Sequence, residues 1–179
     1  MFFRSKPPPL RSVLFVCTAN ITRSPAAAAL FNNLAIKAGE KWIVASAGTK
    51  AFSGARAHIG TIQRLNKRKI PIEGHKSQPV TKKLLSQYRW ILVMAAHHRD
   101  EIIKLDPSAA DKTFCLRTFG LNSPDLITDM PDPTFAPNKL EQQNIEFDEL
   151  FGILDKEVKR AYEILSDRVV NYEMGPEPD

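Results

Sequence analysis

The stretch that decides the fold is VLFVCTANITRSPAAAAL, residues 13–30. It opens with Val13–Val16, a short apolar run of the residue types found in buried parallel strands. It closes with Ser24-Pro25 and four alanines. Serine suits a helix N-cap, and proline suits the first helical position because its missing N–H would have no partner there. The stretch therefore predicts a strand, a tight loop from Cys17 to Arg23, and a helix.

The loop combines a thiol with groups that bind phosphate. Backbone N–H groups at a helix N-terminus converge on an anion, and the helix dipole adds positive potential there. Such a place stabilises a thiolate at Cys17. The planar guanidinium of Arg23 can hold two oxygens of a phosphoryl group. Because a thiolate that faces a phosphate ester can attack phosphorus, the loop predicts a phosphocysteine intermediate.

Strands and helices alternate along the rest of the chain. Alternation of this kind indicates a parallel sheet with helices on both faces. Ligands bind such sheets beyond the carboxyl ends of the strands, which is where Cys17 lies. The patterns predict strands at about 12–17, 42–46, 90–94 and 113–116, and helices at about 25–38, 56–69, 97–105 and 139–170.

The proline-rich residues 120–138 fit no regular element and predict a long functional loop. The leaving oxygen of a phosphate ester needs a proton that a thiolate does not supply, so the site requires a carboxylic acid. Asp132 lies in this loop and is a candidate, and Pro133 restricts it to an extended conformation. Asp125 and Asp129 are rivals in the same loop, and an aspartate that only shapes a turn is the alternative interpretation.

Length and composition bound the class of protein. At 179 residues we expect a flexible leader at 1–10, a single domain at 11–172 and a disordered tail at 173–179. No apolar run reaches transmembrane length. The two cysteines, Cys17 and Cys115, form no disulfide framework, which indicates a cytoplasmic protein. The net charge is +5, but the basic residues are scattered, so we expect no nucleic-acid or membrane partner.

Residues 13–26, VLFVCTANITRSPA, resemble the signature of the low-molecular-weight protein tyrosine phosphatases. The resemblance implies an α/β three-layer sandwich, flavodoxin/Rossmann-like, with a central four-stranded parallel sheet and helices on both faces. It implies a cytoplasmic phosphomonoester hydrolase whose partner is a phosphotyrosine-containing protein or a small aryl phosphate. Further similar segments follow in the family's order along about residues 12–170: Ser46-Ala47-Gly48-Thr49, Gly74-His75-Lys76-Ser77-Gln78, Trp90 to Met94, and Asp132-Pro133.

The resemblance also implies roles for the site residues. Cys17 is the nucleophile, and Asp132 is the acid and then the base. We expect no cofactor and no metal, because the loop and Arg23 supply the positive charge that metal enzymes obtain from an ion. The remaining roles are phosphoryl binding by Arg23, Thr18, Ala19, Asn20, Ile21, Thr22 and Ser24, a supporting polar network from Ser46 and His75, and an aromatic wall from Phe135.

Three further positions depart from the family's pattern. Thr22 replaces a second cysteine that can form a reversible disulfide with the nucleophile, which predicts easier irreversible oxidation of Cys17. Ala19 replaces a glycine, at a cost on the order of 1 kcal/mol if φ is positive there. Ala95 replaces an aspartate after the third strand, with no predicted consequence.

Several functions of this fold stay open. The apolar Ile21 suits an aryl ring better than a guanidinium and favours phosphotyrosine, whereas the family's arginine phosphatases tend to have threonine there. A protein-arginine phosphatase or an arsenate reductase is the alternative enzyme, although the reductase needs further cysteines and Cys115 lies on a predicted strand. A phosphate- or phosphopeptide-binding module with weak or no turnover is the third alternative, suggested by Ala19 and Thr22. The oligomeric state stays open.

Overall fold

The sheet of this protein is seen in a computed structural model that describes residues 7–122, 128–133 and 139–174. In these residues four strands form one parallel sheet in the order β2-β1-β3-β4. This confirms the predicted α/β fold with a central four-stranded parallel sheet. The strands are β1 (Ser12–Cys17), β2 (Ile43–Gly48), β3 (Trp90–Val93) and β4 (Thr113–Cys115).

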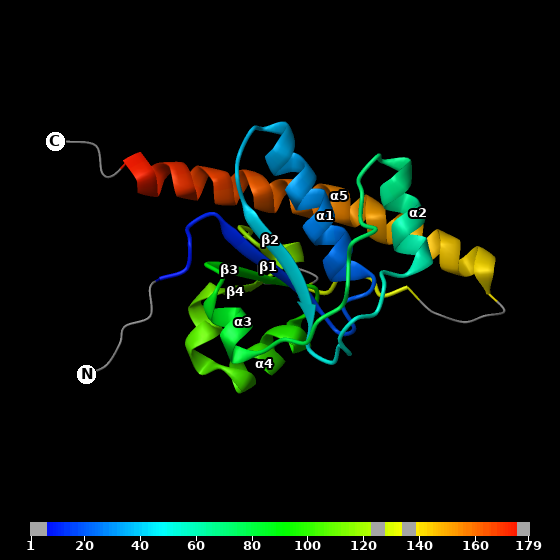
Figure 1. Ribbon diagram of the computed structural model, residues 1–179, viewed down its shortest axis with the longest axis horizontal. Helices are drawn as coiled ribbons and strands as arrows, with labels where there is room; N and C mark the ends of the chain where they lie inside the picture. The colour runs from blue at the N-terminus through cyan, green and yellow to red at the C-terminus, as the bar shows by residue number, and fades with distance from the viewer. Residues whose placement is uncertain (1–6, 123–127, 134–138, 175–179) are drawn as a thin grey trace.

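Helices cover both faces of the sheet (Figure 1). One face carries α1 (Arg23–Lys37) and the long α5 (Leu140–Met174), with α2 (Ile59–Lys67) packed on α5. The other face carries α3 (Lys82–Ser86) and α4 (Ala96–Leu105). Two 3₁₀ helices flank β4: η1 (Pro107–Lys112) and η2 (Leu116–Thr118). No helix in the described ranges is both long and apolar enough to cross a bilayer.

The alternation of β1 divides the core in two. Val13, Phe15 and Cys17 face the layer of α1 and α5, whereas Leu14 and Val16 face the layer of α3 and α4. All six residues of β1 are buried, as the apolar run predicts for a central parallel strand. Because β1 lies between β2 and β3, the chain leaves its carboxyl end at the point where the strand order reverses, which is where ligands bind such sheets.

Element ends differ from the sequence-based expectation where a side chain takes on another task. The first helix begins at Arg23 with Thr22 as its N-cap, not with Ser24, whose hydroxyl is turned toward Cys17 instead. The second helix begins three residues later than predicted, because the His58 side chain accepts a hydrogen bond from the Gly60 N–H and caps it there. The short α3, capped by Thr81, was not predicted, since five residues carry no periodic signal.

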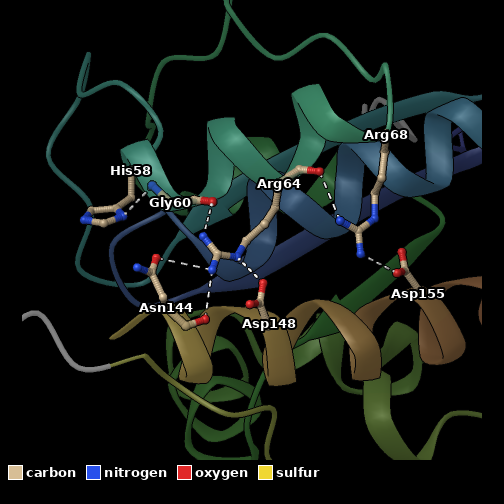
Figure 2. A network of polar contacts seen from close by, with 7 residues as sticks. All are labelled: His58, Gly60, Arg64, Arg68, Asn144, Asp148 and Asp155. Carbon is tan, nitrogen blue, oxygen red and sulfur yellow. Dashed lines mark hydrogen bonds and ion pairs between the residues drawn. The ribbon is translucent and has the colours of Figure 1, made fainter. Parts of the chain in front are cut away.

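The contact between α2 and α5, called the α2–α5 clamp below, is built on Arg64 and Arg68 (Figure 2). Arg64 Nε donates to Asp148 Oδ1 at 2.9 Å and its Nη2 donates to the Asn144 carbonyl at 2.8 Å. Its guanidinium lies 5.0 Å from the centre of the Phe147 ring. Arg68 repeats this one turn later, with an ion pair to Asp155 and a stacked Phe151. These contacts hold α2 against α5.

Candidate active site

The carbonyl oxygens of the Cys17–Arg23 loop point outward into the protein. Five of them accept hydrogen bonds from residues that follow β2, from the turns before and after α2, and from the first turn of α1. The donors are Thr49 N–H to Cys17, Lys50 N–H to Thr18, His75 Nε2 to Asn20, His58 N–H to Ile21 and Ala26 N–H to Thr22, at 2.8–3.3 Å.

The N–H groups of the same loop differ from its carbonyl groups. Among the described residues, none of the N–H groups from Thr18 to Ser24 donates a hydrogen bond to a protein acceptor. Backbone donors are normally satisfied in folded proteins, so a run of open donors at a helix N-terminus is a preorganised oxyanion site.

Asn20 holds the loop in this shape. Its φ is +57°, in the left-handed region that asparagine tolerates better than most residues. Its buried side chain donates from Nδ2 to Ser24 Oγ at 2.9 Å and Ser46 Oγ at 2.8 Å, and its Oδ1 accepts from the Gln78 N–H at 3.0 Å. With the bond from His75 Nε2 to its carbonyl, Asn20 contacts both residues of the expected supporting network, Ser46 and His75.

Ala19 does not carry the strain that its substitution for glycine suggested. The residues of the described chain with positive φ other than glycine are Asn20 and Lys69, so Ala19 has an ordinary backbone. The nearby Gly48 is the residue without room for a side chain, because a Cβ there would collide with the Thr18 carbonyl and approach the Asn20 nitrogen to 2.9 Å. The steric demand for glycine lies beside the loop, not at Ala19.

Cys17 lies at the end of β1 with its sulfur 3.0 Å from Ser24 Oγ. The same hydroxyl accepts from Asn20 Nδ2 and lies 3.2 Å from the Ala47 carbonyl. Its single proton is therefore available to Cys17 Sγ or to that carbonyl. A hydroxyl in this position stabilises a sulfur that becomes negative.

Arg23 is buried, and its guanidinium opens toward the exposed Asp132. Nη2 donates to Asp132 Oδ2 at 2.6 Å and to Thr18 Oγ1 at 3.3 Å. These groups line a cavity of about 190 Å³ together with Cys17 and Ile21, and with Ala19 and Thr22. The structure thus places the expected nucleophile, cation and acid around one small cavity. A larger cavity of about 570 Å³ lies between α1 and β2 and holds none of the three.

His98 is an unexpected neighbour of the loop. Its Nε2 lies 2.8 Å from Thr18 Oγ1, and burial, with the positive charges of His97 and Arg23, lowers its pKa to about 4. The imidazole is therefore neutral at neutral pH, and it completes a chain from His98 through Thr18 to Arg23. No sequence signal marked it, because the contact joins positions 80 residues apart.

The other positions singled out in the sequence make no polar contact with the cavity in the described residues. The Thr22 hydroxyl is buried without a hydrogen-bond partner among the described residues. Phe135 and Asp125 lie outside the described residues. Asp129, a rival to Asp132, is not among the residues that line the cavity and accepts a hydrogen bond from the Ala96 N–H at 2.8 Å. Burial raises the pKa of the half-buried Cys115, which makes that thiol a poor relay.

Known proteins resemble this chain over most of its length. The profile of the family described as low molecular weight phosphotyrosine protein phosphatase matches residues 12–171. The chain is 34% identical over 144 residues to a protein-arginine-phosphatase of Geobacillus stearothermophilus, covering 80% of this chain and 91% of that relative. It is 32% identical over 130 residues to the low molecular weight protein-tyrosine-phosphatase YfkJ of Bacillus subtilis, covering 71% and 83%.

A solved structure of a tyrosine phosphatase has a similar fold. The crystal structure of the tyrosine phosphatase Wzb from Escherichia coli K30 in complex with sulphate superposes with a TM-score of 0.73 at 29% identity, covering 87% of this chain and 98% of that one. The chain belongs to the low-molecular-weight phosphotyrosine protein phosphatase family.

Proposed function

We propose that the protein is a phosphoprotein phosphatase that hydrolyses phosphotyrosine through a phosphocysteine on Cys17. The observation that carries the proposal is the row of N–H groups from Thr18 to Ser24 without an acceptor among the described residues, on the loop that lines one cavity with Asp132. Donors fixed before the substrate arrives stabilise the charge that develops on the transferring phosphoryl group.

In the first step Cys17 Sγ attacks phosphorus while the loop N–H groups and Arg23 hold the phosphoryl oxygens. The bond from phosphorus to the tyrosine oxygen breaks, and Asp132 gives that oxygen its proton. In the second step Asp132 takes a proton from water, which attacks phosphorus and releases phosphate. The Ser24 hydroxyl, 3.0 Å from Sγ, stabilises the departing thiolate. The positive charge comes from the protein, so the reaction requires no cofactor.

The ion pair between Arg23 and Asp132 links binding to acid catalysis. Asp132 Oδ2 accepts from Arg23 Nη2, a donor that a phosphoryl oxygen would also use. A phosphoryl group that takes over Arg23 Nη2 replaces this positive neighbour of Asp132 with negative charge. Substrate binding would therefore release Asp132 from Arg23, so that its carboxyl group can approach the leaving oxygen.

Ile21 supports an aryl substrate. Its side chain lines the cavity and is partly exposed there, so an aromatic ring above the phosphoryl group would meet an apolar wall. A guanidinium would find no polar partner at this position. A protein-arginine phosphatase is the second candidate, favoured by the relative from Geobacillus stearothermophilus.

The weaker alternatives lose support. The ordinary backbone of Ala19 removes one reason to expect a binding module without turnover. The raised pKa of Cys115 argues against an arsenate reductase that relays electrons through this thiol. We also propose a cytoplasmic location and a single domain at residues 11–172.

Hydrolysis of p-nitrophenyl phosphate, with Cys17→Ser and Asp132→Ala as controls, tests the function. We expect turnover in the native protein and its loss in both variants. An active Cys17→Ser variant, or a native protein that binds vanadate but does not turn over, would refute the proposal. A phosphotyrosine peptide and a phosphoarginine peptide of the same sequence then separate the two candidates, and we expect a higher kcat/KM for phosphotyrosine.

A further inference from the structure

Helix α4 begins without a side-chain cap of its own. Its N-cap residue is Ala95, which has no acceptor to offer the first N–H groups of the helix. The Ala96 N–H instead donates to Asp129 Oδ1 at 2.8 Å, from a residue 33 positions further along the chain. N-caps are usually local, so this helix takes its cap from a distant loop.

That loop is the one that carries Asp132, and contacts of Asp129 and Met130 fix it in place. The Met130 N–H donates to the Met94 carbonyl at 2.8 Å, directly after β3, and the Met130 side chain is only 2% exposed. Arg117 Nη1 donates to the Asp129 carbonyl at 2.7 Å. The segment before Asp132 is therefore docked on the sheet edge next to the Cys17–Arg23 loop.

The carboxylate of Asp129 suits this place. Burial alone would raise its pKa, but hydrogen bonds from the Ala96 N–H and the Thr128 hydroxyl, with His97 and His98 nearby, hold that pKa below its usual value. A negative group at a helix N-terminus is also stabilised by the helix dipole.

Asp132 itself has little to hold it. Its side chain is 57% exposed, and among the described residues its hydrogen bond is the one from Arg23. A phosphoryl group that binds Arg23 competes for that contact. When substrate is bound, the anchors that remain on the described part of this segment are the contacts of Asp129 and Met130.

We propose that Asp129 is a positioning residue for the general acid: its carboxylate latches the loop of Asp132 to the N-terminus of α4. The same contact explains how α4 tolerates Ala95 at its N-cap position. A chain with an acidic side chain at position 95 can cap α4 locally, whereas here the cap and the latch are one contact. The inference rests on the proposed function, in which Asp132 protonates the leaving group.

The test compares two aryl phosphates that differ in their need for an acid. Phenyl phosphate has a poor leaving group that must be protonated, whereas 2,4-dinitrophenyl phosphate has a good one that need not be. We expect Asp129→Ala to lower kcat/KM for phenyl phosphate at least tenfold and to change kcat/KM for the dinitrophenyl ester by less than about twofold. Asp129→Asn keeps an acceptor for the Ala96 N–H and should recover most of the loss.

Two further variants separate positioning from stability. In the Asp129→Ala background, Ala95→Asp restores a local cap, so we expect recovered thermal stability without recovered hydrolysis of phenyl phosphate. Asp106→Ala is the matched control, because Asp106 caps the 3₁₀ helix η1 at the other end of α4. We expect it to lower stability and to leave both kcat/KM values unchanged.

Two results would overturn the inference: an equal loss with both esters in Asp129→Ala, or full recovery of phenyl phosphate hydrolysis by Ala95→Asp. Asp132→Asn distinguishes this failure from that of the proposed function. If Asp132→Asn shows no selective loss with phenyl phosphate, the acid itself is misassigned and the latch falls with it.

Discussion

Two buried arginines show how the same side chain serves two purposes. Arg23 is 4% exposed and Arg64 is 5% exposed. Arg64 donates from all three of its nitrogens, to Asp148, Gly60 and Asn144, and stacks on Phe147. The hydrogen bonds of Arg23 to described residues both leave from Nη2, and one of them ends on an exposed carboxylate.

The difference teaches how to recognise a binding arginine. A guanidinium whose donors are all taken by protein acceptors stabilises the fold and has nothing left for a ligand. A buried guanidinium with open donors has lost its water without gaining protein acceptors, so its donors are available to a ligand. Arg23 and Arg64 are equally buried, so their exposed fractions do not distinguish them. The number of guanidinium nitrogens that donate to protein acceptors does distinguish the active site from the α2–α5 clamp.

The largest expected effect comes from the fork of donors on Arg23. Arg23→Lys keeps a positive charge but loses the planar pair of donors, and we expect kcat/KM for an aryl phosphate to fall about 10³-fold. Arg64→Lys is the matched control and should leave kcat/KM of the folded protein within about twofold. Steady-state kinetics of both variants checks this. A loss below tenfold in Arg23→Lys would contradict the assigned role.

A second test asks whether the two regions respond differently to acid. The pKa of His98, beneath the Cys17–Arg23 loop, is about 4 in the folded protein, against 6.5 for an ordinary histidine. The unfolded chain therefore binds a proton between pH 6.5 and 4 that the folded protein does not, and the free energy of unfolding falls as pH drops through this window. The total loss is about 3 kcal/mol.

Urea unfolding at pH 7.5 and at about pH 5 measures this loss. We expect His98→Gln to remove about 2 kcal/mol of the difference in unfolding free energy between the two values. His58, at the α2–α5 clamp, also has its pKa lowered by burial, and His58→Gln should remove a smaller part. Equal effects of the two variants would show that His98 is not buried as described.

Substitutions in the α2–α5 clamp should lower the stability of the protein and leave its catalysis unchanged. Arg64→Leu removes the hydrogen bonds and the stacking on Phe147, and we expect the free energy of unfolding to fall by about 2 kcal/mol. The loss is moderate because Asp148 is largely exposed and is not left as a buried charge. Chemical denaturation gives the loss, and kcat/KM of the folded variant should stay within about twofold. An inactive but stable Arg64→Leu would place the clamp within the active site.

The smallest effect concerns oxidation of the Cys17–Arg23 loop. Thr22 offers no thiol to an oxidised Cys17, so activity lost to hydrogen peroxide should return poorly when dithiothreitol is added. In Thr22→Cys we expect several-fold more activity to return, whereas Thr22→Ser should behave as the native protein does. Equal recovery in Thr22→Cys and the native protein would refute the idea.

The sequence predicts the elements that follow from local pattern. The bounds of β1 agree with the apolar run, and Cys17 and Arg23 lie where the loop between strand and helix requires. Contacts between segments far apart in the chain could not be predicted from these local patterns. The left-handed backbone of Asn20 is held by Ser46 and Gln78, and the contact of His98 with Thr18 crosses the fold.

The two aspartates of the proline-rich loop, Asp129 and Asp132, illustrate the same limit. From sequence alone Asp129 and Asp132 were rivals for one role, since both are carboxylates in one proline-rich loop. In the structure Asp132 reaches Arg23 and Asp129 reaches the Ala96 N–H. Only the placement of α4 beside that loop separates a residue that faces the cavity from one that caps a helix.

The measurement that tests the central claim most directly is mass spectrometry of the protein quenched in acid during turnover of an aryl phosphate. We expect one phosphoryl group on the peptide that contains Cys17, and neither this adduct nor hydrolysis in Cys17→Ala. Rapid hydrolysis by the native protein without a phosphoryl group on Cys17, or continued hydrolysis by Cys17→Ala, would contradict it.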